Sequence, residues 1–161
     1  MFILNYIGYN SAIILSIVGI YMLQNQKLYL IGFILGSILD VCLNKLLKHG
    51  FKQKRPNDPI LFIGIETEST YLHSEQYGMP SGHAQTLFFA LTFLYLVKKS
   101  TTLLILSLFL GGLTFYQRLK YKRHTIEQLC VGAVVGTLFA ITWYNGVNRY
   151  LTKNMFKNMI M

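Results

Sequence analysis

The stretch FILNYIGYNSAIILSIVGIYML, from Phe2 to Leu23, is predominantly apolar and contains no charged side chain. An apolar run of roughly 20 residues is long enough to cross the hydrocarbon core of a bilayer as an α-helix. Four more such runs follow, at Leu28–Leu47, His83–Val97, Thr101–Tyr116 and Ile126–Tyr144. The third and fourth of the five are short, so we expect their helices to include flanking polar residues. The pattern predicts an all-α, polytopic membrane helical bundle with about five transmembrane helices.

The overall composition favours the same class of protein. The chain has 161 residues, 53% of them hydrophobic, and a mean hydropathy of +0.41. A soluble helical bundle would need a polar face on each helix, and these runs have almost none. The first run has no basic start and no small-x-small cleavage site after it, so we interpret it as a retained helix rather than a signal peptide.

The formal net charge of +9 admits three interpretations. Nucleic-acid binding lacks a soluble module or an aromatic and basic platform, so no nucleic-acid partner is expected. Basic residues near the ends of membrane helices commonly face anionic headgroups, and we expect this of Lys52, Lys54, Lys120, Lys122 and Arg123. The third interpretation is an anionic substrate. The cysteines, Cys42 and Cys130, lie inside predicted helices without a metal-binding pattern. They are interpreted as buried packing residues rather than a disulfide or a metal pair.

The span count decides which polar segments share a membrane face. Five crossings place the loop Lys48–Met79, the start of the third helix and the connector Gln117–Gln128 on one face. Three polar segments that are distant in the sequence therefore meet at the ends of helices two to five. We expect a functional site at these helix ends.

The residues gathered on that face suit a phosphoryl group. Lysine supplies a point charge and arginine a planar fork that matches phosphate oxygens, and a helix N-terminus with its backbone N–H groups also favours an anion. A glycine there lets the backbone approach a ligand closely. Two histidines complete the set, and they are able to divide the work of attacking phosphorus and protonating the leaving oxygen. The candidate residues are Lys48, Arg55, Ser81, Gly82, His83, Arg118 and His124.

Three short motifs carry a resemblance to a known family. The segments KHGFKQKRP (Lys48–Pro56), PSGH (Pro80–His83) and QRLKYKRH (Gln117–His124) resemble the three motifs of the type 2 phosphatidic acid phosphatase superfamily, in the same order. The resemblance implies a single integral-membrane phosphatase domain over residues 1–161, with the motif-bearing part at about 40–145. It also implies a reaction without a metal or cofactor.

The resemblance assigns a role to each motif residue. His124 would be the nucleophile and form a phosphohistidine, while His83 would protonate the leaving group and later activate water. The phosphate would be bound by the three cations, the Ser81 hydroxyl and the Gly82 amide; the cations are Lys48, Arg55 and Arg118.

Two positions depart from the family pattern. Gln117 replaces the usual serine, and Gln128 stands where the family has an aspartate that orients the nucleophile. His124 and Gln128 are an i, i+4 pair on one helix face, so the Gln128 carbonyl is placed to accept the Nδ1–H of His124. The chain is then either a slowed or inactive homologue or a member of a branch that uses glutamine.

The second interpretation is favoured, because YKRHTIEQLCVG and SGHAQ resemble motifs of dolichyldiphosphatase-like enzymes. That resemblance implies conversion of a polyprenyl diphosphate to its monophosphate, in an endoplasmic-reticulum-type membrane with a lumenal site. The alternatives are a broad phosphatidate-type phosphatase, a phosphotransferase and a catalytically weakened lipid-binding homologue. Substrate chain length, organism, oligomeric state and orientation stay open.

Other polar residues are given structural interpretations. Asp40 is expected to form hydrogen bonds within the bundle near Asn44, and His49 and His73 are interpreted as loop residues. The apolar segment Ile60–Ile65 is a candidate interfacial helix, and no role is assigned to the acidic loop residues, Glu66, Glu68 and Glu75.

Overall fold

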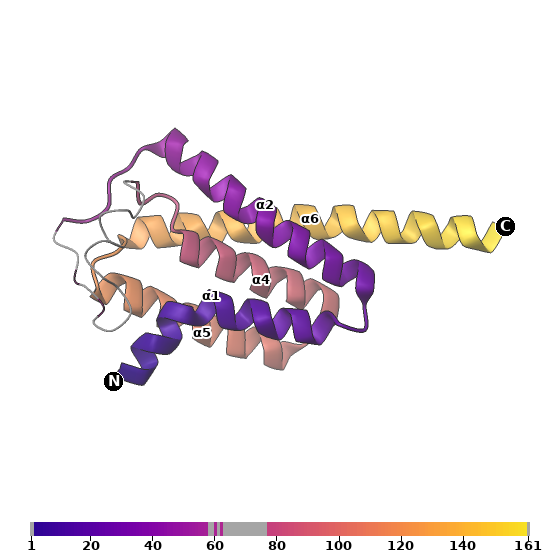
Figure 1. Cartoon of the computed structure of the whole chain (residues 1–161), viewed down its shortest axis with the longest axis horizontal. Helices are drawn as coiled ribbons and strands as arrows, with labels where there is room; N and C mark the ends of the chain where they lie inside the picture. The colour runs from indigo at the N-terminus through magenta and orange to yellow at the C-terminus, as the bar shows by residue number, and fades with distance from the viewer. Residues whose placement is uncertain (1, 58–59, 61, 63–76, 161) are drawn as a thin grey trace.

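The computed structural model (Figure 1) describes residues 2–57, 60, 62 and 77–160, with side chains up to residue 153. Of the predicted interfacial segment Ile60–Ile65, Ile60 and Phe62 are described. The remaining interpretations of the loop, which concern His73 and the three glutamates, lie outside the described residues.

The predicted all-α bundle is confirmed. Its helices are α1 (Phe2–Leu23), α2 (Lys27–Phe51), α4 (Gly82–Lys98), α5 (Thr101–Lys120) and α6 (Ile126–Ile160). Four of these described helices, with α6 counted to Lys153, are long and apolar enough to cross a membrane; α4, with 17 residues, is the exception.

The short helix α4 forms the centre of the bundle and packs against all four other helices. A helix that is apolar on every side is either buried in protein or exposed to lipid, and α4 is buried. Accordingly Leu87, Phe89, Phe93 and Leu94 of α4 are each fully buried. The longer helices surround α4 (Figure 1). Their outer faces carry exposed apolar side chains, and Cys42 and Cys130 are also exposed, so the interpretation of these cysteines as buried is wrong.

The backbones of α4 and α6 approach closely because α6 has glycines where it crosses α4. A Cβ atom on Gly132 would lie 2.6 Å from the Ser81 carbonyl oxygen, and one on Gly136 would lie 3.0 Å from the backbone nitrogen of Phe89. Small residues at such crossings are typical of helix pairs in membranes. This contact fixes the start of α4 against the start of α6.

Three helices, α2, α5 and α6, continue by about one turn or more beyond their predicted ends. The helix α2 extends past Leu47 to Phe51, where Lys52 adopts a left-handed φ of 50° and its N–H donates to the Lys48 carbonyl. The helix α5 extends to Lys120, and α6 continues beyond the bundle (Figure 1). Lys48 is therefore a helical residue, in one buried stripe with Asp40 and Asn44. The interpretation of His49 as a loop residue is wrong for the same reason, because His49 lies in the last turn of α2.

The convergence expected from the span count is present. The ends of α2 and α5 and the starts of α4 and α6 lie at the same end of the bundle, which we call the site end (Figure 1). The loop that follows α2 is joined to the site end through an isolated bridge between Lys54 and Tyr77 and a hydrogen bond from Gly78 N–H to the Gln53 carbonyl, 2.8 Å.

Candidate active site

The PSGH motif forms the N-terminus of α4. Ser81 is the N-cap residue, and its backbone N–H donates to the Gln128 carbonyl at 2.9 Å. Its side chain makes no capping hydrogen bond, and within the described part of the chain its buried Oγ has no hydrogen-bond partner. The hydroxyl and the first N–H groups of α4 together form a place where an anion is favoured.

Gly82 has a neighbour that the sequence did not identify. A Cβ atom there would lie 3.2 Å from Asn44 Oδ1. The Asn44 amide donates to the Pro80 carbonyl at 3.2 Å and to Gln85 Oε1 at 2.8 Å. The missing side chain of Gly82 thus admits Asn44, which fixes the turn before α4.

Asp40 forms hydrogen bonds within the bundle, as expected. Gln85 donates to Asp40 Oδ1 at 2.9 Å, and the Thr86 hydroxyl donates to Oδ2 at 3.2 Å. Through Gln85 the carboxyl is linked to Asn44, its predicted neighbour. A buried polar group is tolerated when it is hydrogen-bonded in this way, and the network fixes α2 against α4.

The contact expected between His124 and Gln128 is present, with His124 Nδ1 3.1 Å from Gln128 Oε1. The Gln128 amide has a defined orientation, because its Nε2 donates to the Lys54 carbonyl at 2.9 Å and its Oε1 accepts from Thr125 N–H at 3.3 Å. Since Oε1 accepts, Nδ1 of His124 must carry the proton. The Nε2 atom of His124 then keeps its lone pair.

Gln128 holds this position because it also caps α6. The Thr125 hydroxyl accepts from the Gln128 N–H at 3.3 Å while Gln128 Oε1 accepts from the Thr125 N–H. This reciprocal pair is a capping box, T-x-x-Q. The residues that begin the helix therefore also orient the histidine just before it.

The electrostatic surroundings keep His124 neutral. The side chain is 4% exposed. The pKa of His124 is lowered to about 3, mainly by burial and further by the charges of Arg55, Arg118 and Lys48, while the Gln128 hydrogen bond acts in the opposite direction. A neutral imidazole with a free lone pair is the form that attacks phosphorus.

The remaining predicted residues surround His83. Arg118, His124, Arg55 and Lys48 all interact with it electrostatically. Lys48 and Arg118 are buried, at 6% and 3% exposure, and Arg55 is half-buried. Buried cations at the end of an apolar bundle are costly unless an anion or a polar partner compensates them. The structure thus brings every predicted site residue together, while the role of each stays a prediction.

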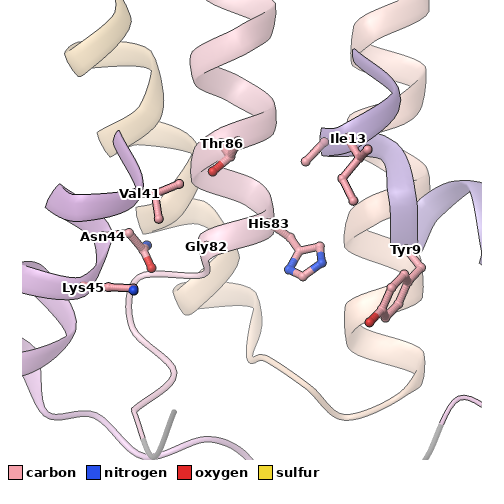
Figure 2. A pocket seen from close by; sticks show the side chains of 9 residues that line it. Tyr9, Ile13, Val41, Asn44, Lys45, Gly82, His83 and Thr86 are labelled. Carbon is pink, nitrogen blue, oxygen red and sulfur yellow. The ribbon is translucent and has the colours of Figure 1, made fainter. Parts of the chain in front are cut away.

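A cavity of about 320 Å³ opens beside His83, between α1, α2 and α4 (Figure 2). Its wall is largely apolar and includes Ile13 of α1 and Val41 of α2, whereas Asn44 and Thr86 supply polar groups. The His83 ring projects from the start of α4 toward Tyr9 of α1 (Figure 2). The cavity joins the polar site end to the apolar flank of the bundle.

A family model described as the PAP2 superfamily matches residues 29–151, which include all of these motifs. The chain belongs to the PAP2 superfamily. Among relatives of this PAP2 chain, lipid phosphate phosphatase epsilon 1, chloroplastic, of Arabidopsis thaliana is 37% identical over 73% of the chain and 40% of its own length. Dolichyldiphosphatase 1 of Dictyostelium discoideum is 33% identical over 75% of the chain and 53% of its own length. Dolichyldiphosphatase 1 of Mus musculus is 32% identical over 79% of the chain and 56% of its own length.

The chain thus spans about half the length of the curated relatives it matches. No solved structure matches this PAP2 chain.

The expectation that Arg123 faces headgroups is wrong. Arg123 is 3% exposed, and its N–H donates to the Arg118 carbonyl at 2.9 Å. The chain turns sharply between α5 and α6, with Lys122 at a φ of 50°, and this turn folds the arginine inward. The position of Arg123 in the sequence places it in the connector between α5 and α6 but does not give the direction of its side chain.

Three residues of this PAP2 site were not anticipated from the sequence. Gln53 and Lys54 hold the Gln128 amide through the Gln53 side-chain oxygen, at 3.1 Å from Gln128 Nε2, and the Lys54 backbone carbonyl. Tyr9 lies before the matched residues and places its ring 4.6 Å from the Arg118 guanidinium carbon and 5.7 Å from the His83 ring centroid. An apolar helix in the sequence carries no signal for such a contact.

Proposed function

We propose that the chain is a membrane phosphohydrolase that removes a phosphate from a lipid phosphate through a phosphohistidine on His124. The observation that carries the proposal is the placement of His124: buried, neutral, with Nδ1 held by Gln128 and within electrostatic reach of Lys48, Arg55 and Arg118. Membership of the PAP2 superfamily supports the same class of reaction.

In the first step of the proposal, His124 Nε2 attacks the terminal phosphorus. A P–N bond forms as the bond from phosphorus to the leaving oxygen breaks. His83, whose protonated form is favoured by the negative charge of the bound phosphate, gives that oxygen its proton. The developing charge on the phosphoryl oxygens is stabilised by the three cations and by the N-terminus of α4. Gln128 accepts the Nδ1–H bond throughout, so the ring keeps its orientation.

In the second step, water replaces the leaving group. His83, now without its proton, takes one from the water, whose oxygen attacks phosphorus while the P–N bond breaks. Inorganic phosphate leaves, and His124 returns to its neutral form. One residue thus serves as acid and then as base on the same side of the phosphorus.

The preferred substrate in this proposal is a polyprenyl diphosphate, which would leave as the monophosphate. The apolar cavity beside His83 supports a lipid leaving group (Figure 2), and two of the relatives described above are named dolichyldiphosphatase. The alternative is a broader lipid phosphate phosphatase, which the name of the Arabidopsis relative supports.

Phosphate release by the purified protein in detergent tests the proposal. Isoprenyl diphosphate and phosphatidate are compared as substrates for the parent and for His124→Ala, and we expect the substitution to lower kcat by more than about a thousandfold. His49→Ala is the matched control, because His49 is an exposed histidine on α2 whose ring packs against Tyr77. Phosphate release that survives in His124→Ala would remove the enzymatic proposal.

The proposal also places the site end on the lumenal side of an endoplasmic-reticulum-type membrane. A cysteine introduced in place of the exposed Lys54 reports on this. In sealed microsomes with the native cysteines replaced, a membrane-impermeant thiol reagent should label it only after the membrane is opened. Labelling of intact vesicles would place the site on the cytosolic side.

A further inference from the structure

Tyr9 of α1 occupies a position between two residues of the candidate site. Its ring lies 4.6 Å from the guanidinium carbon of Arg118 and 5.7 Å from the centroid of His83. It also forms part of the cavity wall, opposite Val41 (Figure 2). The helix that carries it precedes the residues matched by the family model, 29–151.

The helix α1 is held against α5 in one register, so Tyr9 is not placed there by chance contact. A Cβ atom on Gly8 would lie 2.9 Å from the Leu113 carbonyl carbon, which requires close approach of the two backbones. The hydroxyls of Ser11 and Thr114 are hydrogen-bonded across the same interface. Arg118 follows Thr114 by four residues on α5, so the side chains of Tyr9 and Arg118 meet next to this contact.

The Tyr9 ring also packs against Phe62, which belongs to the loop between α2 and α4. Phe62 is 2% exposed, and its ring centroid lies 5.8 Å from that of Tyr9 and 4.9 Å from that of Tyr121. Aromatic pairs at such distances favour fixed relative orientations. Phe62 therefore links the Tyr9 ring, which contacts Arg118, to Tyr121 at the end of α5.

A ring stacked on a guanidinium has a defined chemical consequence. It attracts the cation through its face and restricts the plane of the group, while the N–H bonds stay directed outward in that plane. Two-point binding of a phosphate needs a guanidinium held in such a plane.

We propose that Tyr9 is a positioning residue, which holds the Arg118 guanidinium in the orientation that binds the substrate phosphate. This inference rests on the proposed function, because it takes the phosphate to be the ligand of Arg118. It makes α1 a part of the active site rather than an anchor alone.

The test measures binding of inorganic phosphate, the reaction product, by calorimetry on the purified full-length protein in micelles. We expect Tyr9→Leu to weaken phosphate binding about three- to thirtyfold, the range that a cation–π contact contributes. Tyr9→Phe keeps the ring and should bind phosphate within about twofold of the parent. Tyr6→Leu is the matched control, since Tyr6 lies on the same helix and is 49% exposed.

Coupling between the two residues separates positioning from general support of the fold. Arg118→Leu should weaken phosphate binding, and adding Tyr9→Leu to it should cause no further loss. An equal additional loss in the double variant would overturn the inference. Should Tyr9→Leu fail to fold, Tyr9→Met removes the ring while keeping an apolar side chain of similar length, and the same comparison applies.

The outcomes distinguish this inference from the function on which it rests. If Arg118→Leu weakens phosphate binding and Tyr9→Leu does not, the positioning role fails and the proposed function stands. If Arg118→Leu leaves phosphate binding unchanged, the phosphate site itself is wrong, and both proposals fail.

Discussion

The site end of the bundle and the half beyond it are built by the same helices but held together in different ways. Beyond the site, α4 presents Phe89, Phe93 and Leu94, all fully buried, to Phe33 of α2 and Ala140 of α6. At the site end, a group of buried side chains is polar or charged, and hydrogen bonds link Asp40 and Asn44 to Gln85 and His124 to Gln128. The group comprises Asp40, Asn44, Lys48, Ser81, Gln85, Arg118, His124 and Gln128.

The difference indicates that the apolar half provides most of the stability of the bundle, whereas the polar half orients the side chains of the site. In a bilayer, close packing of apolar side chains and backbones is the main force between helices. Buried cations contribute no such stability, because their desolvation costs about as much as their interactions return. The apolar half therefore supplies the frame, and the hydrogen bonds at the helix ends set directions within it.

Gly136→Leu should break the apolar half and produce the largest effect. The added side chain would meet the backbone of α4, with its Cβ 2.9 Å from the Gln85 carbonyl carbon. We expect destabilisation of roughly 3 kcal/mol or more and loss of both fold and activity. Thermal unfolding in detergent measures this, with Gly146→Leu as control, because a Cβ on Gly146 of the same helix meets no atom within 4 Å. Equal stability of the two variants would contradict the packing argument.

Gln128→Leu should break the polar half alone. It removes the acceptor for His124 Nδ1 and the donor to the Lys54 carbonyl, so we expect kcat to fall roughly a hundredfold while the thermal midpoint changes by a few degrees. Gln128→Asp should keep measurable activity, since a carboxylate still accepts the Nδ1–H. Equal activity in the Leu and Asp variants would mean that Gln128 orients nothing.

Gln128→Glu tests the polar half more specifically, because glutamate has nearly the same shape as glutamine but lacks the amide donor. Its second carboxylate oxygen would face two acceptors, the Lys54 carbonyl at 2.9 Å and the Gln53 side-chain oxygen at 3.1 Å. Activity should therefore be low near neutral pH and recover relative to the parent as pH falls, because a protonated carboxyl donates as the amide does. A pH profile of kcat parallel to the parent's would show that the donor side of the amide has no role.

The grouping of the helix ends and the contacts within one helix could be predicted from the sequence, whereas the contacts between helices could not. The number of apolar runs determines which polar segments share a face, and helical spacing pairs His124 with Gln128; both follow from chain geometry alone. The capping box T-x-x-Q was also readable in principle at Thr125 and Gln128.

Side-chain direction between helices was not predictable. The helices are apolar on nearly all sides, so periodicity does not show which face of α1 meets α5. Tyr9 was missed for this reason. The inward turn of Arg123 and the helical position of Lys48 depend on how a connector closes and how far a helix continues, and both are set by tertiary contacts.

Val41→Trp should perturb the boundary between the halves, with a smaller effect. The new side chain would fill part of the 320 Å³ cavity beside His83, so we expect KM for a long-chain polyprenyl diphosphate to rise about tenfold. A short, water-soluble isoprenyl diphosphate should show little change. Leu39→Trp is the control, because Leu39 lies on α2 at 43% exposure and outside the cavity wall. Equal effects on both substrates would remove the lipid assignment of the cavity.

The pH dependence of stability should show the smallest effect. It measures how much the burial of His124 beside cations destabilises the folded chain at low pH. The pKa of His124 is lowered from 6.5 to about 3 by burial and by nearby cations. Between these pH values the unfolded chain binds a proton at His124 that the folded chain does not bind. The free energy of unfolding is therefore at its full value above pH 6.5 and decreases as pH falls toward 3. At pH 5.5 the loss is about 1.4 kcal/mol, or about 3–5 °C in the thermal midpoint. His124→Asn cannot titrate, so its midpoint should fall less between pH 7.5 and 5.5 than the parent's, whereas the exposed His49→Asn should follow the parent. Parallel curves for the parent and His124→Asn would mean that His124 titrates normally in the folded chain.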